Sequence, residues 1–148
     1  MSIRFATEDD LPTLIDMVEH FYNQTPYSKA LVFSKDKTLN TLVSILHGSK
    51  EDGIILVLAD PSPVGLIVAS VTEPLCSEGK HATELVWWVN EGYRGRASLE
   101  LLNAYEYWQE KVGCSGVSMA STQGGSDLDK FYKRRGYTTS EITYYKAN

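Results

Sequence analysis

Residues 90–98 read Asn90-Glu91-Gly92-Tyr93-Arg94-Gly95-Arg96-Ala97-Ser98. They join a tryptophan-containing segment, predicted to be a strand over 82–90, to an amphipathic segment predicted to be a helix over 97–111. Small residues at positions 92, 95 and 97 let a ligand approach the backbone closely. A glycine turn at the start of a helix offers backbone N–H groups and the positive end of the helix dipole, and both favour a phosphate group.

Arg94 and Arg96 add charge-assisted hydrogen-bond donors to this turn, on a chain whose formal net charge is −5. The spacing differs from a P-loop, since no Gly-Lys-Ser/Thr follows, and from a dinucleotide fingerprint, which needs three glycines. The turn by itself leaves two interpretations open: a phosphate site, or a helix-start loop whose arginines are solvated.

The rest of the chain is predicted to alternate between strands and helices without a repeat or a long linker. Thr7 and Asp10 have the spacing of a capping box ahead of the first helix, and Ser126 is placed to cap the last one. The predicted order βααβββαβαβ contains strand–helix–strand crossovers, which require parallel neighbours in a mixed sheet. The predicted elements are strand 3–6, a helix that follows the Thr7 cap and ends near residue 23, helix 35–47, strands 54–59, 64–71 and 82–90, helix 97–111, strand 117–120, helix 127–135 and strand 139–145.

Composition indicates one globular domain over residues 1–148, with 43% hydrophobic and 22% charged residues. The acidic balance, 19 acidic against 14 basic side chains, argues against general nucleic-acid binding, which needs a basic face. No apolar run is long enough to span a bilayer, and the acidic N-terminal segment lacks the apolar stretch of a signal peptide. Two cysteines are too few for a disulfide framework, so we expect a cytoplasmic protein. The three histidines and the cysteines show no metal-ligand spacing, so we expect no metal site.

The run from Tyr93 to Ala97 resembles the acetyl-CoA-binding signature of the GCN5-related N-acetyltransferases (GNAT), Gln/Arg-x-x-Gly-x-Gly/Ala. Gly95 and Ala97 match its last two fixed positions, whereas Gly92 stands where the family usually has Gln or Arg. The predicted element order is similar to that of the family along nearly the whole chain. Residues 131–137 also resemble its aromatic-Tyr-(three residues)-Gly-aromatic run on the last helix.

The resemblance implies the α/β fold of that family, a mixed sheet of six to seven strands with helices on both faces, whose strands 82–90 and 117–120 splay apart. Acetyl-CoA is expected in that gap. Its pantetheine arm would pair with the backbone near Trp88 and Val89. The family often has an asparagine before the last helix, where this chain has Gly125-Ser126. The residues expected at the pyrophosphate are Arg94, Gly95, Arg96, Ala97 and Ser98.

Transfer of an acetyl group to an amine needs a base, because an amine with a pKa of about 10.4 is protonated at neutral pH and the cation cannot attack. Glu84 is the predicted base; strand alternation places it on the same face as Val86 and Trp88, and a solvated strand-face glutamate is the alternative. Tyr132 is the predicted acid, since its phenol stays protonated at pH 7, and a tyrosine at this position commonly has that role in the family.

The predicted function is direct acetyl transfer from acetyl-CoA to a primary amine of a small molecule or protein. Because the chain is acidic, a cationic acceptor such as a polyamine, a protein amine or an aminoglycoside is expected, with Tyr22, Tyr27 and Phe33 as walls of its pocket. One tryptophan of the pair 87–88 is expected in the core and the other at the cleft or an oligomer contact, which leaves a homodimer open. Two alternatives remain: a non-catalytic acyl-CoA-binding or protein-interaction member of the same fold, and an unrelated nucleotide-binding module.

Overall fold

A computed structural model describes residues 1–122 and 127–148. These residues form a five-stranded mixed sheet in the order β1-β2-β3-β4-β5, antiparallel except for the last pair. The elements are β1 (Ser2–Phe5), α1 (Leu11–Asn23), α2 (Lys35–His47), β2 (Gly53–Ala59), β3 (Pro63–Thr72), β4 (His81–Val89), α3 (Arg96–Lys111), β5 (Gly116–Ser118) and α4 (Asp127–Arg134).

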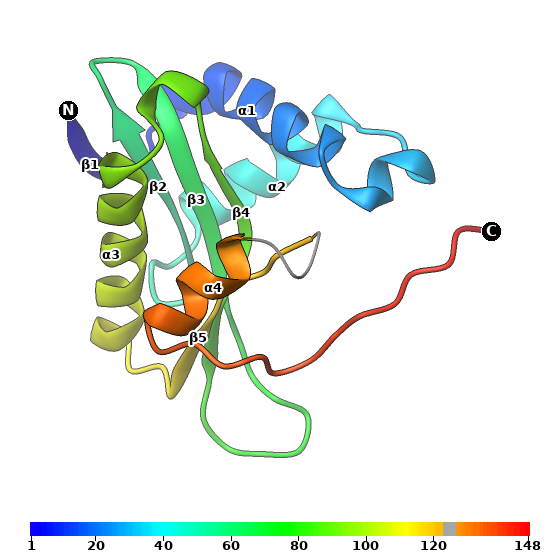
Figure 1. The fold of residues 1–148 in the computed structure, drawn as a ribbon. Helices are drawn as coiled ribbons and strands as arrows, with labels where there is room; N and C mark the ends of the chain where they lie inside the picture. Colours follow the sequence, from blue (N-terminus) through cyan, green and yellow to red (C-terminus); the bar gives the residue numbers. More distant parts are fainter. Residues whose placement is uncertain (123–126) are drawn as a thin grey trace.

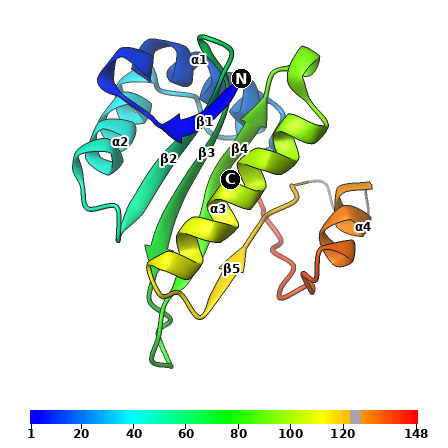
Figure 2. The same ribbon diagram turned by 90° about the vertical axis from the view of Figure 1, so that its left-hand side faces the viewer.

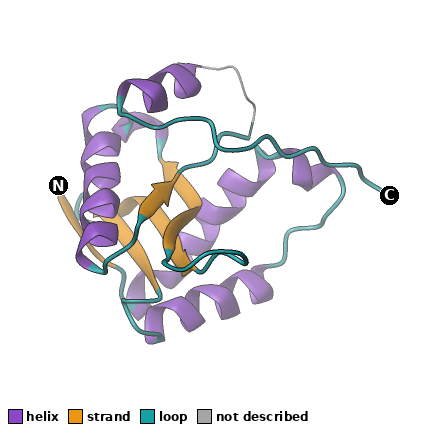
Figure 3. Cartoon of the chain, turned by 90° about the horizontal axis from the view of Figure 1, so that it is seen from below, coloured by secondary structure: helices purple, strands orange, loops and turns teal. Residues whose placement is uncertain are grey.

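The sheet is sandwiched between helices, as predicted (Figure 1). Helices α1 and α2 cover one face, where they pack on β2, β3 and β4. Helix α3 crosses the opposite face, and α4 lies beyond β5, as the side view of Figure 2 shows. Viewed from below, the strands lie between these helices, with the C-terminal segment passing along the outside (Figure 3). None of the helices in the described part of the chain is both long and apolar enough to span a bilayer.

The predicted local signals explain how the first two helices begin. The capping box is present: the Thr7 backbone N–H donates to the Asp10 carboxylate at 2.8 Å ahead of α1. Ser34 caps α2, because its side chain accepts from the Lys37 backbone N–H at 3.1 Å. Leu14 and Leu42 are then buried on the helical stripes that face the sheet.

Strands β2 and β3 form the centre of the core. Every residue of β2 is buried, because α1 and α2 cover one face of the strand and α3 covers the other. This accounts for its continuous apolar run, which lacks the alternation of a half-exposed strand. The two strands predicted over 54–59 and 64–71 are confirmed, and they pair in antiparallel register as a hairpin.

The parallel pair of β4 and β5 is short. Only His81, Ala82 and Thr83 of β4 pair with β5, at Gly116, Val117 and Ser118 respectively. Strand β4 continues to Val89 without β5 beside it, so the sheet opens along the second half of β4. The predicted splay between these strands is therefore present.

The prediction of a last strand over residues 139–145, and with it a sheet of six to seven strands, is wrong. The described residues after α4 form no strand, and the chain runs as an extended segment along the outside of the molecule (Figures 1 and 3). Alternation of apolar residues marks this segment as strand-like, yet Ile142 is 71% and Tyr144 89% exposed. An alternating pattern gives a segment one apolar face, but a strand also needs a neighbouring strand to pair with. Without such a neighbour, the backbone of the segment stays exposed to water.

Candidate active site

A cleft of about 630 Å³ opens where β4 and β5 separate, a volume typical of small-molecule sites. Its walls come from the end of α1 and the turn after it, the second half of β4, the first turn of α3, the segment after β5, and α4. The cleft brings together the proposed base Glu84 and the proposed acid Tyr132. The other described residues that line it are Phe21, Tyr22, Gln24, Thr25, Tyr27, Leu85, Trp87, Trp88, Val89, Arg94, Ser98, Ala120, Ser121, Thr122 and Leu128.

A β-bulge at Leu85 decides which way Glu84 points. Ala69 of β3 lies opposite Glu84, and its neighbour Val68 lies opposite Val86. Leu85 is therefore an extra residue in β4. The extra residue reverses the alternation. The prediction that Glu84 shares a face with Val86 and Trp88 is therefore wrong: Val86 and Trp88 pack on the α1–α2 side, whereas Glu84 lies on the α3 side.

Glu84 is a buried carboxyl group at the floor of the cleft, with 9% of its surface exposed. Burial raises the pKa of Glu84 to about 7, and the hydrogen bond that its Oε2 accepts from the Ala120 backbone N–H at 3.3 Å opposes that rise. At neutral pH the group is therefore divided between its acid and its base forms, which suits proton transfer. The alternative of a solvated strand-face glutamate does not fit this position.

Tyr132, on α4, is buried beside Glu84. Its hydroxyl donates to the Ala120 carbonyl at 3.3 Å, and its ring packs against Trp87 and Phe131. Burial, and next to it the charge of Glu84, raises the pKa of the Tyr132 phenol well above its ordinary value. The phenol therefore keeps its proton at neutral pH and can act as a donor inside the cleft.

Helix α4 is attached to α3 by a polar contact that positions Tyr132. The Arg135 guanidinium, just after α4, forms hydrogen bonds of 2.7 and 3.3 Å with the Glu106 carboxylate, and the Tyr137 hydroxyl donates to the same carboxylate at 2.9 Å. Because both groups follow α4 directly, they hold its C-terminal end against α3.

Gly95 begins helix α3 in a conformation that side chains disfavour. Its φ is +106°, and an added Cβ there would meet no atom within 4 Å, so a larger residue would be strained by its backbone and not by a clash. The turn thereby leads the chain sharply from β4 into α3. The first backbone N–H groups of α3 have no intrahelical partner and lie beside the cleft, because Ser98 lines it.

Arg94 is oriented by the end of β4. Its Nε donates to the Val89 carbonyl at 2.8 Å, and its guanidinium lies 4.9 Å from the centre of the Trp88 ring. The Asn90 backbone N–H donates to the Val64 carbonyl of β3. In a trans peptide unit the C=O points opposite to the N–H, so the Val89 carbonyl points away from β3, into the opening. The terminal guanidinium nitrogens of Arg94 remain available as donors to an anion.

The remaining residues predicted at the pyrophosphate occupy different environments. The Arg96 side chain is 93% exposed and pairs with Glu100 at 3.5 Å, so its contribution to the start of α3 is its backbone N–H. Ala97 packs against the core beneath α3, which makes a small side chain suitable there. Gly125 and Ser126, compared above with the asparagine of the family, lie outside the described residues.

The rim of the cleft is aromatic. Tyr22 and Tyr27 line it, and Phe33 supports Tyr22 at a ring distance of 5.8 Å but is not among the lining residues. The sequence did not identify Phe21 and Ala120 as residues of the cleft. Phe21 is part of the apolar stripe of α1, which predicts only packing. Ala120 contacts Glu84 and Tyr132 through its backbone N–H and C=O, which no side-chain pattern marks. In the described part of the chain, no three His, Cys, Asp or Glu side chains lie close enough together to hold a metal ion.

Comparison with known proteins gives one family and one fold. The profile of the acetyltransferase (GNAT) family matches residues 14–137. No curated protein matched the sequence.

Solved structures with the same fold include proteins of different description, all at low sequence identity. A transcriptional regulator from Bacillus halodurans C-125 matches with a TM-score of 0.78 and 18% identity, over 99% of both chains. An aminoglycoside N-acetyltransferase in complex with CoA matches with a TM-score of 0.77 and 16% identity, over 99% of this chain and 93% of that one. An aminoglycoside antibiotic 6'-N-acetyltransferase from Acinetobacter haemolyticus matches with a TM-score of 0.74 and 15% identity, over 100% and 98%.

Proposed function

Because this chain belongs to the acetyltransferase (GNAT) family, we propose that it is an acetyl-CoA-dependent N-acetyltransferase that acetylates a primary amine by direct transfer. The observation that supports this most strongly is the pairing of Glu84, whose pKa is raised to about 7, with Tyr132 in one cleft next to a helix N-terminus. Acetyl-CoA supplies the acetyl thioester. The residues of this chain bind it, orient the amine and move the protons.

The glycine turn is the proposed site for the diphosphate. Arg94 would donate from its terminal nitrogens, while its Nε stays on the Val89 carbonyl. Gly95, Arg96, Ala97 and Ser98 would contribute through the start of α3, where unpaired backbone N–H groups attract an anion. The pantetheine arm would lie along β4 at Trp88 and Val89, where β5 no longer pairs with the edge of β4.

Glu84 is the proposed base. An amine enters the cleft as an ammonium ion, and its first proton passes to the Glu84 carboxylate, which leaves a lone pair on nitrogen. The pKa of about 7 keeps a sizeable fraction of Glu84 ionised at neutral pH while making it a stronger base than an ordinary glutamate. After the new C–N bond forms, nitrogen still holds one surplus proton, which neutralises the departing thiolate.

Tyr132 is the proposed donor to the departing sulfur. An ordinary thiol has a pKa of about 8.5 and an ordinary phenol about 10, so full transfer of the phenol proton to a thiolate is already unfavourable by about 2 kcal/mol. Burial raises the pKa of Tyr132 further. We therefore assign Tyr132 a hydrogen bond to the thiolate, and the proton that completes the thiol comes from the attacking nitrogen.

The test is thiol release from acetyl-CoA with a panel of amines, using Glu84→Gln and Tyr132→Phe. We expect kcat to fall by about 10²–10⁴-fold for Glu84→Gln and by a smaller factor for Tyr132→Phe, with the Kd for acetyl-CoA retained. Matched controls are Glu110→Gln and Tyr107→Phe, exposed residues of α3 that do not line the cleft. Binding of acetyl-CoA without turnover of any amine would instead identify a non-catalytic binder of the same fold.

A further inference from the structure

We propose that the acceptor is a small amine with one positive charge and an aromatic or apolar body, and that polycations are poor acceptors. This inference rests on the proposed function and assigns the substrate class of the same cleft. It narrows the cationic acceptors expected from net charge to a class chosen by the side chains that line the site.

The wall formed by the end of α1 and the turn after it is aromatic. Phe21, Tyr22 and Tyr27 all line the cleft from this segment. Across the opening, Trp87 and Tyr132 add aromatic surface beside Glu84. Aromatic faces bind apolar groups and also attract a single ammonium ion, so this wall suits both ends of an arylalkylamine.

The aromatic wall is held in place before an acceptor arrives. The Tyr22 hydroxyl donates to the Leu31 carbonyl at 2.5 Å, and its ring packs against Phe33. The Tyr27 ring contacts Tyr145 edge to face, with ring centres 5.0 Å apart. A surface whose side chains are already ordered loses less entropy when an apolar ligand binds to it.

The cleft offers a polycation too few partners. Among the described residues that line it, Glu84 is the only acidic side chain and Arg94 the only basic one. The proposed chemistry uses Glu84 for the reacting nitrogen. A second or third ammonium group would therefore meet aromatic rings or stay in water, and a charge desolvated without a counter-ion is costly.

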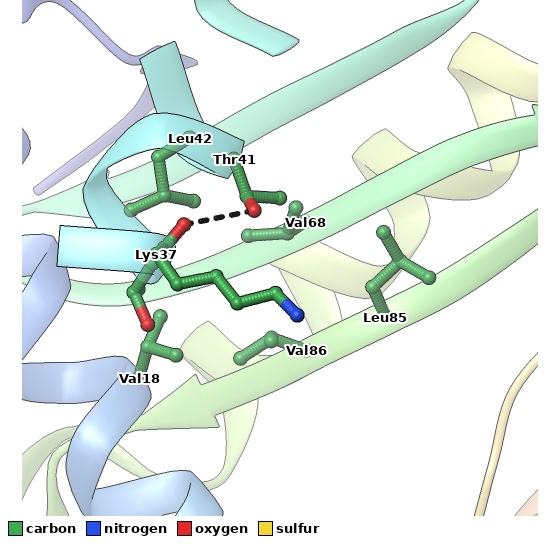
Figure 4. A pocket seen from close by; sticks show the side chains of 8 residues that line it. Val18, Lys37, Thr41, Leu42, Val68, Leu85 and Val86 are labelled. Carbon is green, nitrogen blue, oxygen red and sulfur yellow. Dashed lines mark hydrogen bonds between the residues drawn. The ribbon is translucent and has the colours of Figure 1, made fainter. Parts of the chain in front are cut away.

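The neighbouring pocket adds no carboxylate either. A smaller cavity of about 240 Å³ between α2 and β4 shares Leu85 with the cleft (Figure 4). Its walls include Val18, Leu42 and Val86, and Lys37, which extends across Val86 (Figure 4), is the one charged side chain among the described residues that line it. An acceptor that reached past the bulge would meet apolar surface and a like charge, which disfavours a polyamine and tolerates a hydrocarbon chain or ring.

The test compares 2-phenylethylamine with spermine, kanamycin and a lysine-containing peptide at saturating acetyl-CoA. We expect kcat/KM for 2-phenylethylamine to exceed that of each other amine by tenfold or more. Phe21→Ala should raise the KM for 2-phenylethylamine about tenfold and leave the KM for acetyl-CoA unchanged. Tyr107→Ala, an aromatic truncation on the outer face of α3, should change neither.

Binding to the CoA-loaded protein, measured by calorimetry, separates this inference from the proposed function. Tighter binding of 2-phenylethylamine than of spermine or kanamycin supports the acceptor class even if no amine turns over, a result that would refute the transferase. Equal or better turnover of spermine, kanamycin or the peptide would overturn the acceptor class and leave the transferase standing. Failure of 2-phenylethylamine to bind at all would also overturn it.

Discussion

Replacing Glu84 with glutamine should make the protein more stable at alkaline pH while removing its proposed base. The pKa of this buried carboxyl is raised from 4.5 to about 7 in the folded chain. At about 1.4 kcal/mol per pKa unit, keeping Glu84 ionised costs the folded state roughly 3 kcal/mol above pH 7. Glutamine has nearly the same shape and carries no charge, so it removes that cost.

The sign of the pH dependence follows from proton binding. Between the unfolded pKa near 4.5 and the folded pKa near 7, the folded state holds more protons at Glu84 than the unfolded state. Stability of the natural chain therefore falls as pH rises through this window, and the fall is complete above it. The variant lacks this titration, so the stability difference between the two proteins should widen from pH 5 to pH 8.5 by about 2–3 kcal/mol.

The assay is denaturant unfolding of both proteins at pH 5 and pH 8.5, with Glu110→Gln as a control at an exposed position. Comparing the two pH values cancels any packing difference between glutamine and protonated glutamate. A stability difference that stays constant between pH 5 and pH 8.5 would refute the reasoning, because Glu84 would then titrate alike in the folded and unfolded chains. The kcat/KM of the natural enzyme should also rise with pH through an apparent pKa near 7.

Four further substitutions test separate parts of the structure. Tyr132→Phe removes the 3.3 Å hydrogen bond to the Ala120 carbonyl and the proposed donor to sulfur. We expect kcat to fall about 10–100-fold in rapid-mixing kinetics. The free energy of unfolding should change by about 1 kcal/mol or less. Arg94→Ala should raise the Kd for CoA about tenfold in calorimetry. Arg96→Ala, which loses a solvated side chain, should change that Kd less than threefold. Equal effects of the two variants on Kd would contradict the different roles assigned to Arg94 and Arg96. Asp10→Asn should destabilise the chain by about 1–3 kcal/mol at pH 7, because the Asp10 carboxylate accepts two hydrogen bonds from Arg4. The kcat should stay unchanged. Because the pKa of Asp10 is lowered, the unfolding curves of the two proteins should converge as pH falls below about 4.

The sequence predicted those parts of the molecule that local chemistry determines. Thr7 with Asp10 marks a helix start through side-chain hydrogen bonds that reach only three residues. The glycine turn at Gly95 is equally local, since a positive φ at the start of a helix selects glycine. The β-branched apolar runs of β2 and β3, separated by a short turn that contains proline, predicted two neighbouring strands.

The direction of the Glu84 side chain could not be predicted from the strand pattern. Strict alternation assigns it to the face of Trp88, and one extra residue at Leu85 moves it to the other face. A bulge depends on the register in which β4 pairs with β3, and the pattern of β4 alone does not specify that register. The last predicted strand failed for a related reason: residues 139–145 have the pattern of a strand, but pairing requires a neighbour that the pattern does not specify.

The bulge also brings the proposed base and the proposed donor into one cleft, where each would affect the other. It brings Glu84 to the α3 side, where Tyr132 of α4 is buried, and the charge of Glu84 contributes to the high pKa of the Tyr132 phenol. In the proposed mechanism, that charge disappears when Glu84 accepts the proton of the amine, and Tyr132 then becomes a better hydrogen-bond donor as the thiolate begins to leave. Proton transfer at the base thereby strengthens the donor. On strict alternation the two groups would lie on opposite faces of the sheet, and this coupling would be lost.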